Sequence, residues 1–243
     1  MWRKVNRVRI LDCTIRDGGY ISNWHFSLDY AKRVYDQCCL AGIDCVEMGY
    51  KTSAPHYNPE KHGIWKNVSE SMLKQYNGSA KISVMVDDNR IDIKEIVKAE
   101  ESTITLYRVA VHPYNIPEAL SVIRGIREKG YRVSMNLMYI SEYTEQQATE
   151  AIEQIKDEDI EYLYLVDTKG ELHPHITAYI VKKFKGAGKK LGYHGHNENG
   201  MVLENTLAAI KSGVEIVDCT DFGMGRNGGN LCRKEILSAV RSM

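Results

Sequence analysis

Short apolar runs rich in β-branched residues alternate with stretches of helical periodicity along the whole chain. The strand-like runs are Val8–Ile15, Cys45–Gly49, Lys81–Val86, Leu106–Val111, Arg132–Tyr139, Tyr162–Val166, Leu191–His196 and Glu215–Thr220. The helical stretches include Ser27–Ala41, Trp65–Tyr76, Pro117–Lys129, Glu145–Lys156, Pro174–Phe184, Val202–Lys211 and Cys232–Arg241. Within one of them, Ala151, Ile152 and Ile155 have the i, i+1, i+4 spacing of an apolar helix face. The pattern predicts strands that alternate with helices from end to end.

Helix boundaries are marked by polar residues and glycines. Thr144 is followed three residues later by Gln147, which predicts a capping box at a helix start. Gly42, Gly130 and Gly213 stand just after three helical stretches, where glycine commonly ends a helix. These signals support the alternation independently of hydrophobicity.

Eight strands, each followed by a helix, predict a (β/α)8 TIM barrel. A doubly wound open sheet is the second hypothesis, but this number of repeats fits a closed barrel better. No linker rich in Pro, Gly or Ser interrupts the chain, so we expect residues 1–243 to form a single catalytic domain. The longest polar connection, Tyr50–Gly63, follows the second strand and would lie at the catalytic face, as a lid or as a plain surface loop.

Composition narrows the class of partner. Hydrophobic residues make up 43% of the 243 residues, as in an ordinary globular domain. The 32 basic residues balance the 32 acidic residues, so the net charge is zero. A neutral chain offers no electrostatic reason to expect nucleic acid or an anionic membrane as a partner. We therefore expect a small-molecule substrate, with a homo-oligomer left open.

The cysteines and the N-terminus indicate a cytoplasmic protein. The chain has six cysteines and no Cys-x-x-Cys pair, which is typical of reduced thiols rather than a disulfide framework or a zinc knuckle. No apolar segment follows the charged N-terminus, so we expect no signal peptide. No apolar run approaches the roughly 20 residues that a membrane span needs.

Two segments carry the types of residue that bind a metal ion. His194 and His196 are two residues apart on the seventh strand and so lie on the same face of it. The first strand runs into Arg16 and Asp17, followed by two glycines. In a closed barrel the first and seventh strands are separated only by the eighth, so all three ligands can converge. Two imidazoles and one carboxylate predict an open site for a divalent metal. Asp17 in a simple turn and chance packing of the histidines are the weaker interpretations.

Three motifs together resemble one family. They are Asp-Cys-Thr-Ile-Arg-Asp-Gly at 12–18, His-Gly-His-Asn at 194–197 and Gly-Met-Gly-Arg-Asn-Gly-Gly-Asn at 223–230. In this order they resemble the metal-dependent lyase and condensing-enzyme superfamily of HMG-CoA lyase, 2-isopropylmalate synthase, homocitrate synthase and 4-hydroxy-2-oxovalerate aldolase. The resemblance covers essentially the whole chain and is greatest to the catalytic barrel of the aldolase.

The resemblance implies roles for individual residues. Asp17, His194 and His196 would bind one divalent ion, usually Mn, Mg or Co, and Asn230 would lie at or near it. Arg16 would orient a 2-keto acid and stabilise its enolate, because a guanidinium binds a carboxylate through two hydrogen bonds and stays charged.

Further candidates line the other strand ends. By resemblance, Arg108 and His112 would contact substrate, although an arginine at the sheet edge and a turn histidine are equally compatible. Asp167 and Thr168 end the sixth strand, in a position that the resemblance places near substrate. Glu47 ends the second strand, as a pocket carboxylate or as a buried ion-pair partner.

Tyr20 departs from the family pattern. The aldolases have a histidine base at this position and the synthases a glutamine. A phenol, with an ordinary pKa of about 10, is a poorer general base at neutral pH than an imidazole. Tyr20 is nevertheless our candidate, with Arg16, for the catalytic residues.

The motifs together predict a metal-dependent carbon–carbon lyase, an aldolase that cleaves or forms a 4-hydroxy-2-oxo acid through a pyruvate-type enolate. A Claisen-type synthase that joins an acyl-CoA to a keto acid, a Schiff-base aldolase using Lys169, and a non-catalytic barrel that binds a metal or a keto acid are the alternatives. A metal hydrolase is disfavoured because its His-x-His pair usually lies on the first strand.

The segment 223–228 also matches the G-x-G-x-x-G pattern of dinucleotide-binding folds. Such folds need the pattern after an early strand, with an acidic residue about 20 positions later, and the chain ends before that point. A phosphate site after the eighth strand, suited to a phosphorylated or CoA-ester substrate, is the second interpretation.

Overall fold

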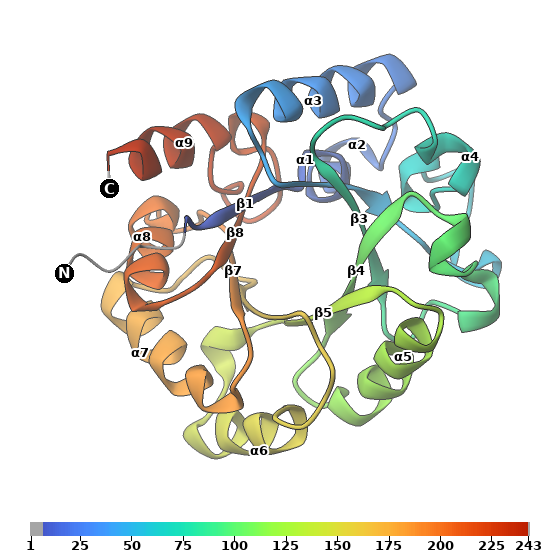
Figure 1. Ribbon diagram of the computed structural model, residues 1–243. Helices are drawn as coiled ribbons and strands as arrows, with labels where there is room; N and C mark the ends of the chain where they lie inside the picture. Colours follow the sequence, from blue (N-terminus) through green and yellow to red (C-terminus); the bar gives the residue numbers. More distant parts are fainter. Residues whose placement is uncertain (1–6, 243) are drawn as a thin grey trace.

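The computed structural model describes residues 7–242, and the predicted lack of a signal peptide concerns residues outside this range. Its strands close into one parallel barrel, with neighbours in chain order and β8 beside β1 (Figure 1). The strands are β1 (Arg9–Asp12), β2 (Cys45–Tyr50), β3 (Lys81–Asp87), β4 (Ile104–Val111), β5 (Arg132–Leu137), β6 (Tyr162–Asp167), β7 (Leu191–Gly195) and β8 (Ile216–Cys219). The predicted TIM barrel is confirmed, and the open sheet is excluded.

Helices form the outer ring of the barrel (Figure 1). The longer ones are α3 (Leu28–Ala41), α5 (Ile116–Glu128), α6 (Glu145–Ile155), α7 (Pro174–Phe184), α8 (Val202–Ser212) and α9 (Arg233–Arg241). Each agrees with its predicted range to within one residue at either end. Among the described residues, no helix is both long and apolar enough to cross a membrane.

The predicted helix boundaries have the expected local chemistry. Thr144 and Gln147 form the capping box, each side chain accepting a hydrogen bond from the other residue's backbone N–H. Gly42 ends α3 with a φ of 73°, a left-handed conformation that glycine adopts without steric cost. Gly213 ends α8 in the same way, and Gly130 is left-handed one residue beyond the last turn of α5.

The prediction of one helix over Trp65–Tyr76 is wrong. The chain there forms the 3-10 turn η2 (Ile64–Lys66) and the short helix α4 (Glu70–Leu73). Tertiary contacts override the helical periodicity, because the Trp65 indole donates to the Phe26 carbonyl at 2.9 Å and the Val68 N–H donates to the Tyr50 carbonyl at 2.8 Å. Between β3 and β4 the described chain forms only the 3-10 turns η3 (Ile93–Glu95) and η4 (Ala99–Glu101), with no α-helix. Not every strand is therefore followed by an α-helix.

The first strand is shorter than predicted, and this changes how the site is built. It stops at Asp12, whose carboxylate accepts the Thr14 N–H at 3.0 Å and turns the chain. The next residues form the helical turn α1 (Thr14–Asp17), followed by α2 (Gly19–Ser22). Asp17 thus lies on a helical turn beyond the strand and not at the strand end.

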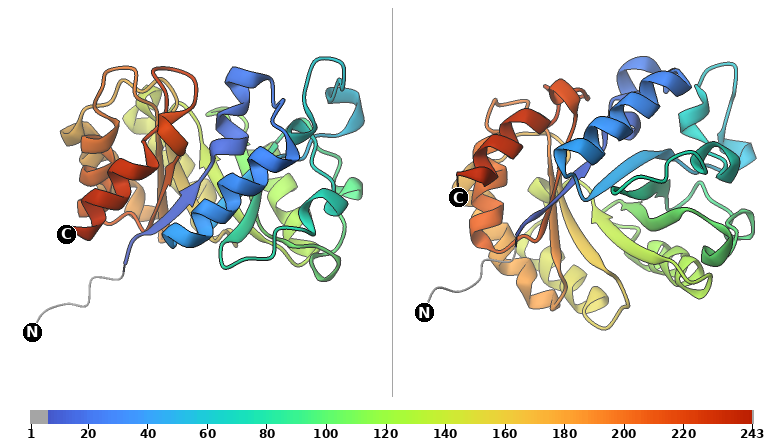
Figure 2. Two further views of the ribbon diagram at one scale, coloured as in Figure 1. Left: turned by 90° about the horizontal axis from the view of Figure 1, so that it is seen from above. Right: turned by 45° about the horizontal axis from the view of Figure 1, so that its top comes forward.

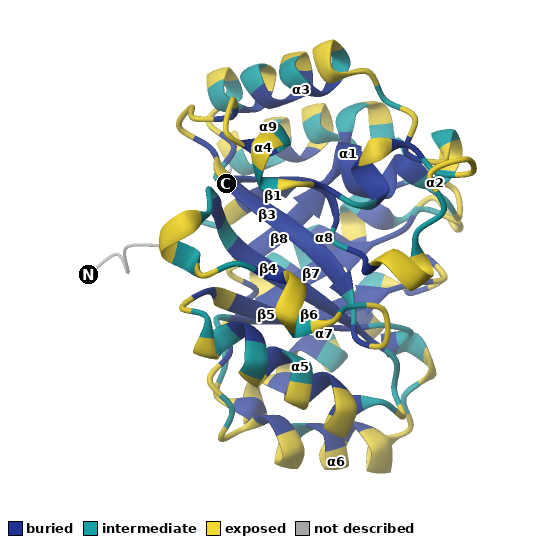
Figure 3. Ribbon diagram, turned by 90° about the vertical axis from the view of Figure 1, so that its right-hand side faces the viewer, coloured by how far each residue is buried: buried dark blue, intermediate teal, exposed yellow. Residues whose placement is uncertain are grey.

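The catalytic rim is the end of the barrel to which the strands point. In the left view of Figure 2, α1 and α2, the loop after β2 and the loop after β8 rise from the same rim, opposite the described start of β1. The strands themselves are almost wholly buried (Figure 3). Their inward side chains include charged residues, so the barrel interior beneath the rim is a polar network rather than a purely apolar core.

Candidate metal centre and keto-acid pocket

A cavity of about 300 Å³ opens at the catalytic rim, in the size range of small-ligand pockets. Arg16 and Tyr20 contribute to its wall from the segment after β1, and His194 and His196 from the end of β7. Arg226 closes it from the loop after β8. The wall therefore combines hydrogen-bond donors and metal ligands with a few apolar side chains.

The three predicted metal ligands converge beside this cavity: His194 and His196 line it, and Asp17 is buried next to them. The ligand atoms of Asp17, His194 and His196 all lie within 4.8 Å of one another, and all three side chains are buried. Because these atoms come from three different backbone positions around the barrel, folding holds them at one place without any ion. The two imidazole rings are 4.9 Å apart and nearly perpendicular.

Both histidines direct the same ring nitrogen toward the cavity. The Nδ1 atom of His194 lies 2.8 Å from an Asp218 carboxylate oxygen, and the Nδ1 atom of His196 lies 3.2 Å from the Asp167 carbonyl oxygen. Each Nδ1–H can donate to its oxygen, which leaves both Nε2 atoms as acceptors. The Nε2 atom of His194 is buried and has no hydrogen-bond partner among residues 7–242. A cation would satisfy this atom, so the residues present fit a divalent metal.

The charge states of the ligands also suit a cation. Burial lowers the pKa of His194, although the hydrogen bond to Asp218 opposes the shift, so the imidazole is neutral at neutral pH. Burial alone would raise the pKa of the Asp17 carboxyl, but the neighbouring Arg16 guanidinium holds this pKa well below its usual range. The set therefore includes one carboxylate, that of Asp17, and the neutral imidazole of His194, as metal ligation requires.

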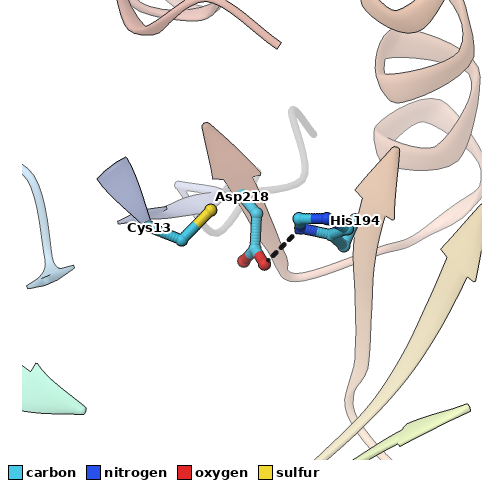
Figure 4. Close-up of side chains that lie close together, drawn as sticks. All are labelled: Cys13, His194 and Asp218. Carbon is cyan, nitrogen blue, oxygen red and sulfur yellow. Dashed lines mark hydrogen bonds and ion pairs between the residues drawn. The ribbon is translucent and has the colours of Figure 1, made fainter. Parts of the chain in front are cut away.

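A second cluster, formed by Cys13, His194 and Asp218, fits a cation less well. Figure 4 shows the Asp218 carboxylate between the Cys13 thiol and the His194 ring. Burial raises the pKa of Cys13 well above its ordinary value, so sulfur stays a thiol, whereas a metal needs the thiolate. Asp218 is already bound to His194 and, at 2.6 Å, to Arg108. We therefore assign Asp218 to orienting His194.

Asn230 contacts the metal-ligand set through Asp17. Its Nδ2 atom donates to an Asp17 carboxylate oxygen and, at 3.0 Å, to the Met224 carbonyl. A backbone bridge between His196 and Asn230 brings the loop after β8 to β7. A side-chain Cβ at Gly225 would lie 1.9 Å from this Nδ2 atom, so only glycine allows this close approach. Asn230 thus orients the carboxylate in this geometry.

Arg16 is anchored on one side and free on the other. Its Nε atom donates to Glu47 at 2.6 Å, and Nη1 donates to Asp17. No described residue accepts a hydrogen bond from Nη2, and the side chain lines the cavity. A substrate oxygen can therefore bind to a guanidinium that two carboxylates already hold in place.

Glu47 and Arg108 lie beneath the cavity and not on its wall. Both side chains are fully buried, and Arg108 bridges Glu47 at 3.0 Å to Asp218 at 2.6 Å. This chain of ion pairs links the residue that holds Arg16 to the residue that holds His194. The prediction of substrate contact is not met by this geometry, because the carboxylates take the Arg108 donors first. We therefore assign Glu47 and Arg108 a role in positioning the side chains of Arg16 and His194.

The other predicted substrate residues fall into two groups, one on the cavity wall and one away from it. His112 lies on the cavity wall, stacked between Tyr114 and Tyr139. Asp167 and Thr168 do not line the cavity. The Asp167 carboxylate accepts the N–H groups of the following turn, and the Thr168 hydroxyl accepts the Tyr139 N–H at 2.7 Å. Both hold loops next to the site.

Tyr20 lies on the cavity wall with a partner that the sequence did not reveal. Its hydroxyl is 2.9 Å from the hydroxyl of Tyr50, at the end of β2. The Arg226 guanidinium stacks on the Tyr20 ring, with its central carbon 4.2 Å from the centre of the ring. Tyr50, Arg226 and Asp218 were absent from the sequence prediction, although Asp218, an acidic residue inside an apolar strand, was a readable signal.

Lys169, the candidate for Schiff-base chemistry, is directed away from the cavity. Its ammonium pairs with Glu142 at 2.5 Å, and nearly half of its side chain is exposed. Lys66 is the buried lysine nearest the site, but its ammonium stacks on the rings of Tyr50 and Trp24, at 3.7 and 4.3 Å from their centres. Neither lysine lines the cavity.

Comparison with known proteins agrees with this geometry. The family model described as HMGL-like matches residues 7–243. The chain is 27% identical to an oxaloacetate decarboxylase of Mycobacterium tuberculosis, over 95% of this chain and 69% of the relative. It is also 27% identical to a 4-hydroxy-2-oxovalerate aldolase of Carboxydothermus hydrogenoformans, over 96% and 70% of the two chains. A 2-isopropylmalate synthase of Methanocaldococcus jannaschii is 26% identical, over 98% of this chain and 46% of the relative.

Solved structures give the same fold. The N-terminal domain of a candidate aldolase from Bacteroides vulgatus superimposes with a TM-score of 0.83 and 27% identity, covering 96% of this chain and 79% of that one. The carboxyl transferase domain of Rhizobium etli pyruvate carboxylase reaches a TM-score of 0.77 over 97% of this chain and 43% of that one. At 17% identity, this second likeness concerns the fold alone.

Proposed function

Because this chain belongs to the HMGL-like family, we propose that it is a divalent-metal-dependent carbon–carbon lyase that cleaves or forms a 4-hydroxy-2-oxo acid. The observation that carries the proposal is that Asp17, His194 and His196 cluster together, and that both histidines line the same cavity as Arg16. The relatives include an aldolase, a decarboxylase and a condensing synthase, all of which act next to a keto or acyl group. The aldolase is our choice within that range.

The 2-oxo acid end of the substrate binds at Arg16. The free Nη2 donates to the substrate carboxylate or to the neighbouring keto oxygen, while Glu47 keeps the guanidinium plane fixed. Asp17, His194 and His196 would hold the divalent ion, with Mn, Mg or Co suited to these donors. When bound, the cation supplies positive charge beside the oxygen that becomes negative as the carbon–carbon bond breaks.

Tyr20 transfers the proton to and from the 4-hydroxyl oxygen of the substrate. In the direction of synthesis, the phenol donates its proton to the new alkoxide, and cleavage reverses the transfer. The Tyr50 hydroxyl, 2.9 Å away, fixes the direction of the Tyr20 hydroxyl, and the Arg226 guanidinium stacks on the Tyr20 ring. This arrangement gives a tyrosine the role that a histidine would otherwise have.

A direct assay tests the proposal. We expect the protein, loaded with Mn²⁺, to release pyruvate from at least one member of a series of 4-hydroxy-2-oxo acids, and a chelator to stop the release. Pyruvate is measured by coupling to lactate dehydrogenase. Release of free thiol from acetyl-CoA in the presence of a 2-oxo acid, with no pyruvate formed from any hydroxy acid, would instead identify a condensing synthase. Borohydride trapping that resists chelator would identify a Schiff-base aldolase.

Replacing Arg16 by lysine should lower kcat/KM by about ten- to a hundredfold, the value of one or two hydrogen bonds to a charged group. Lysine keeps the positive charge but cannot bind Glu47 and the substrate at once with a planar fork. The metal content should stay at the wild-type level, as measured by elemental analysis. Wild-type kinetics in Arg16→Lys would remove Arg16 from the mechanism.

The six cysteines are free thiols in the described chain, and several are buried. This state is typical of a reducing compartment. We therefore also propose a cytoplasmic location. Oligomeric state in solution stays open in the proposal.

A further inference from the structure

Arg226 differs from the other enclosed arginines of the described chain. Arg16 pairs with Asp17 and Glu47, Arg108 pairs with Glu47 and Asp218, and Arg233 pairs with Asp12 and Asp221. Each of these three thus has two carboxylate partners. Arg226 has no carboxylate within salt-bridge distance among residues 7–242. Its buried Nε atom also has no hydrogen-bond partner, a feature that it shares with Arg108. An anionic group on a ligand in the cavity would supply the partner that Arg226 lacks.

The position of Arg226 directs it at the substrate. Its side chain lines the cavity together with Arg16 and the two histidines, and its guanidinium stacks on Tyr20. A planar guanidinium on an aromatic ring keeps its edge available for hydrogen bonds with a carboxylate or phosphate. The stacking holds the group in place while leaving those donors free.

The backbone that carries Arg226 is tied down on both sides. The Arg226 carbonyl accepts the Gly229 N–H at 3.0 Å, and the Asn227 side chain donates to the Thr168 carbonyl at 2.7 Å. The Asn197 N–H donates to the Gly229 carbonyl at 2.9 Å, which joins the loop to the chain after β7. The position is therefore held before any ligand arrives, which lowers the entropic cost of binding.

Other charges at the cavity do not provide the missing anion. Asp87 pairs with Arg90 at 3.6 Å, and Asp88 forms no salt bridge with Arg226. Lys66, the other cation without a carboxylate close by, is covered by aromatic rings and does not line the cavity. Burial lowers its pKa to about 8, so its charge is also partly lost near neutral pH. Of the three arginines on the cavity wall, Arg226 is therefore the one without a carboxylate partner among the described residues.

We propose that Arg226 forms a second anion-binding subsite, so that the natural substrate is a 2-oxo acid carrying another anionic group, a carboxylate or a phosphate, in addition to the carboxylate at Arg16. The inference rests on the proposed function for the placement of the first carboxylate. A dianionic substrate would give Arg226 an anionic partner in addition to the contact at Arg16, whereas a monoanionic one bound at Arg16 would leave Arg226 without one. Arg226 thereby selects the substrate class within the lyase reaction.

Calorimetric titration of the full chain with matched ligands tests this proposal. The dicarboxylates are oxaloacetate, 2-oxoglutarate and 2-oxoadipate, and their monocarboxylate partners are 2-oxobutanoate, 2-oxopentanoate and 2-oxohexanoate. Phosphonopyruvate represents the phosphate class. Titrations are made with and without Mn²⁺, so that the readout is binding and not turnover. For at least one of the three pairs, we expect the dicarboxylate to bind at least about tenfold more tightly than its monocarboxylate partner. Alternatively, phosphonopyruvate should bind at least about tenfold more tightly than the monocarboxylates.

Two variants locate that preference. Arg226→Gln should abolish the ratio between dianion and monoanion, and Arg226→Lys should retain part of it. Arg90→Gln is the matched control, because Arg90 lines the same cavity but already pairs with Asp87. The preference should survive in this control. An equal affinity of the wild type for all pairs, a ratio unchanged in Arg226→Gln, or a ratio lost only in Arg90→Gln overturns the proposal.

An inorganic anion separates this inference from the proposed function. If no 2-oxo acid binds to the wild type, the lyase proposal fails, and titration with inorganic phosphate then decides the subsite by itself. Phosphate binding that disappears in Arg226→Gln supports the subsite without the lyase. Phosphate binding that is unchanged in this variant, or absent from the wild type, overturns it. If 2-oxo acids bind without preference for dianions, only the second subsite fails.

Discussion

Replacing His194 and His196 together by alanine should abolish metal binding and reduce turnover to that of the metal-free protein. The wild type should take up about one divalent ion per chain after loading with Mn²⁺, as measured by elemental analysis. The double variant removes both Nε2 ligands and leaves one carboxylate, which cannot hold the ion alone. Circular dichroism should show an intact barrel, because both replacements shorten side chains at the rim and leave the strand backbone unchanged.

A second pair of histidines gives a matched control. His173 and His175 flank Pro174 at the start of α7, and both are exposed. The variant His173→Ala with His175→Ala should bind the full amount of metal and turn over normally. Stoichiometric metal in His194→Ala with His196→Ala would place the ion elsewhere. Loss of metal in Cys13→Ala, which changes only the alternative cluster, would move it to Cys13, His194 and Asp218.

Tyr20→Phe should lower kcat by about 10²–10⁴-fold, the usual contribution of a positioned proton-transfer group. The variant removes one hydroxyl and keeps the ring that packs against Trp24 and Arg226. Fold and metal content should therefore not change. Tyr50→Phe should give a smaller loss, because it removes the hydroxyl that orients Tyr20 while leaving the proton-transfer group itself. Kinetics of pyruvate release measure both variants.

Two further variants sharpen this test. Tyr114→Phe is the matched control at an exposed tyrosine near the cavity, and it should be silent. Tyr20→His restores the residue that the family resemblance expects and should keep or raise pyruvate release. A silent Tyr20→Phe in an active enzyme would assign the proton transfer to another group. His112 is then the next candidate because it lines the cavity, whereas His25 is exposed and lines a separate hollow. If neither the wild type nor Tyr20→His cleaves a keto acid, the chain is a binding protein.

The sequence by itself determined the architecture and identified the candidate metal ligands. The alternation of strand and helix patterns, the caps at Thr144 and Gly42, and the number of repeats were local signals that survive in the barrel. His194 and His196 were readable because their spacing puts both on one face of a strand, whatever the rest of the fold does. Asp17 was readable because a barrel brings the first strand near the seventh.

Where local periodicity and tertiary contacts disagreed, the sequence prediction was wrong. The residues Trp65–Tyr76 have a helical pattern, but the buried Trp65 ring and the contact of Val68 with Tyr50 break it into a 3-10 turn and a short helix. The strand predicted over Val8–Ile15 stops at Asp12, because that side chain hydrogen-bonds the backbone two residues ahead and turns the chain. These contacts join residues far apart or depend on one side-chain orientation, so no window of sequence contains them.

Only the tertiary structure decided which polar residues face substrate. Arg16, Arg108 and Arg226 are the same residue type near strand ends, and nothing local distinguishes them. Arg108 is neutralised by Glu47 and Asp218, which come from β2 and β8, whereas Arg226 meets no carboxylate at all among the described residues. The free charge of an arginine depends on acids that other strands bring within about 4 Å, because ion pairing is a short-range interaction of side chains distant in sequence. That distance is set when the barrel closes.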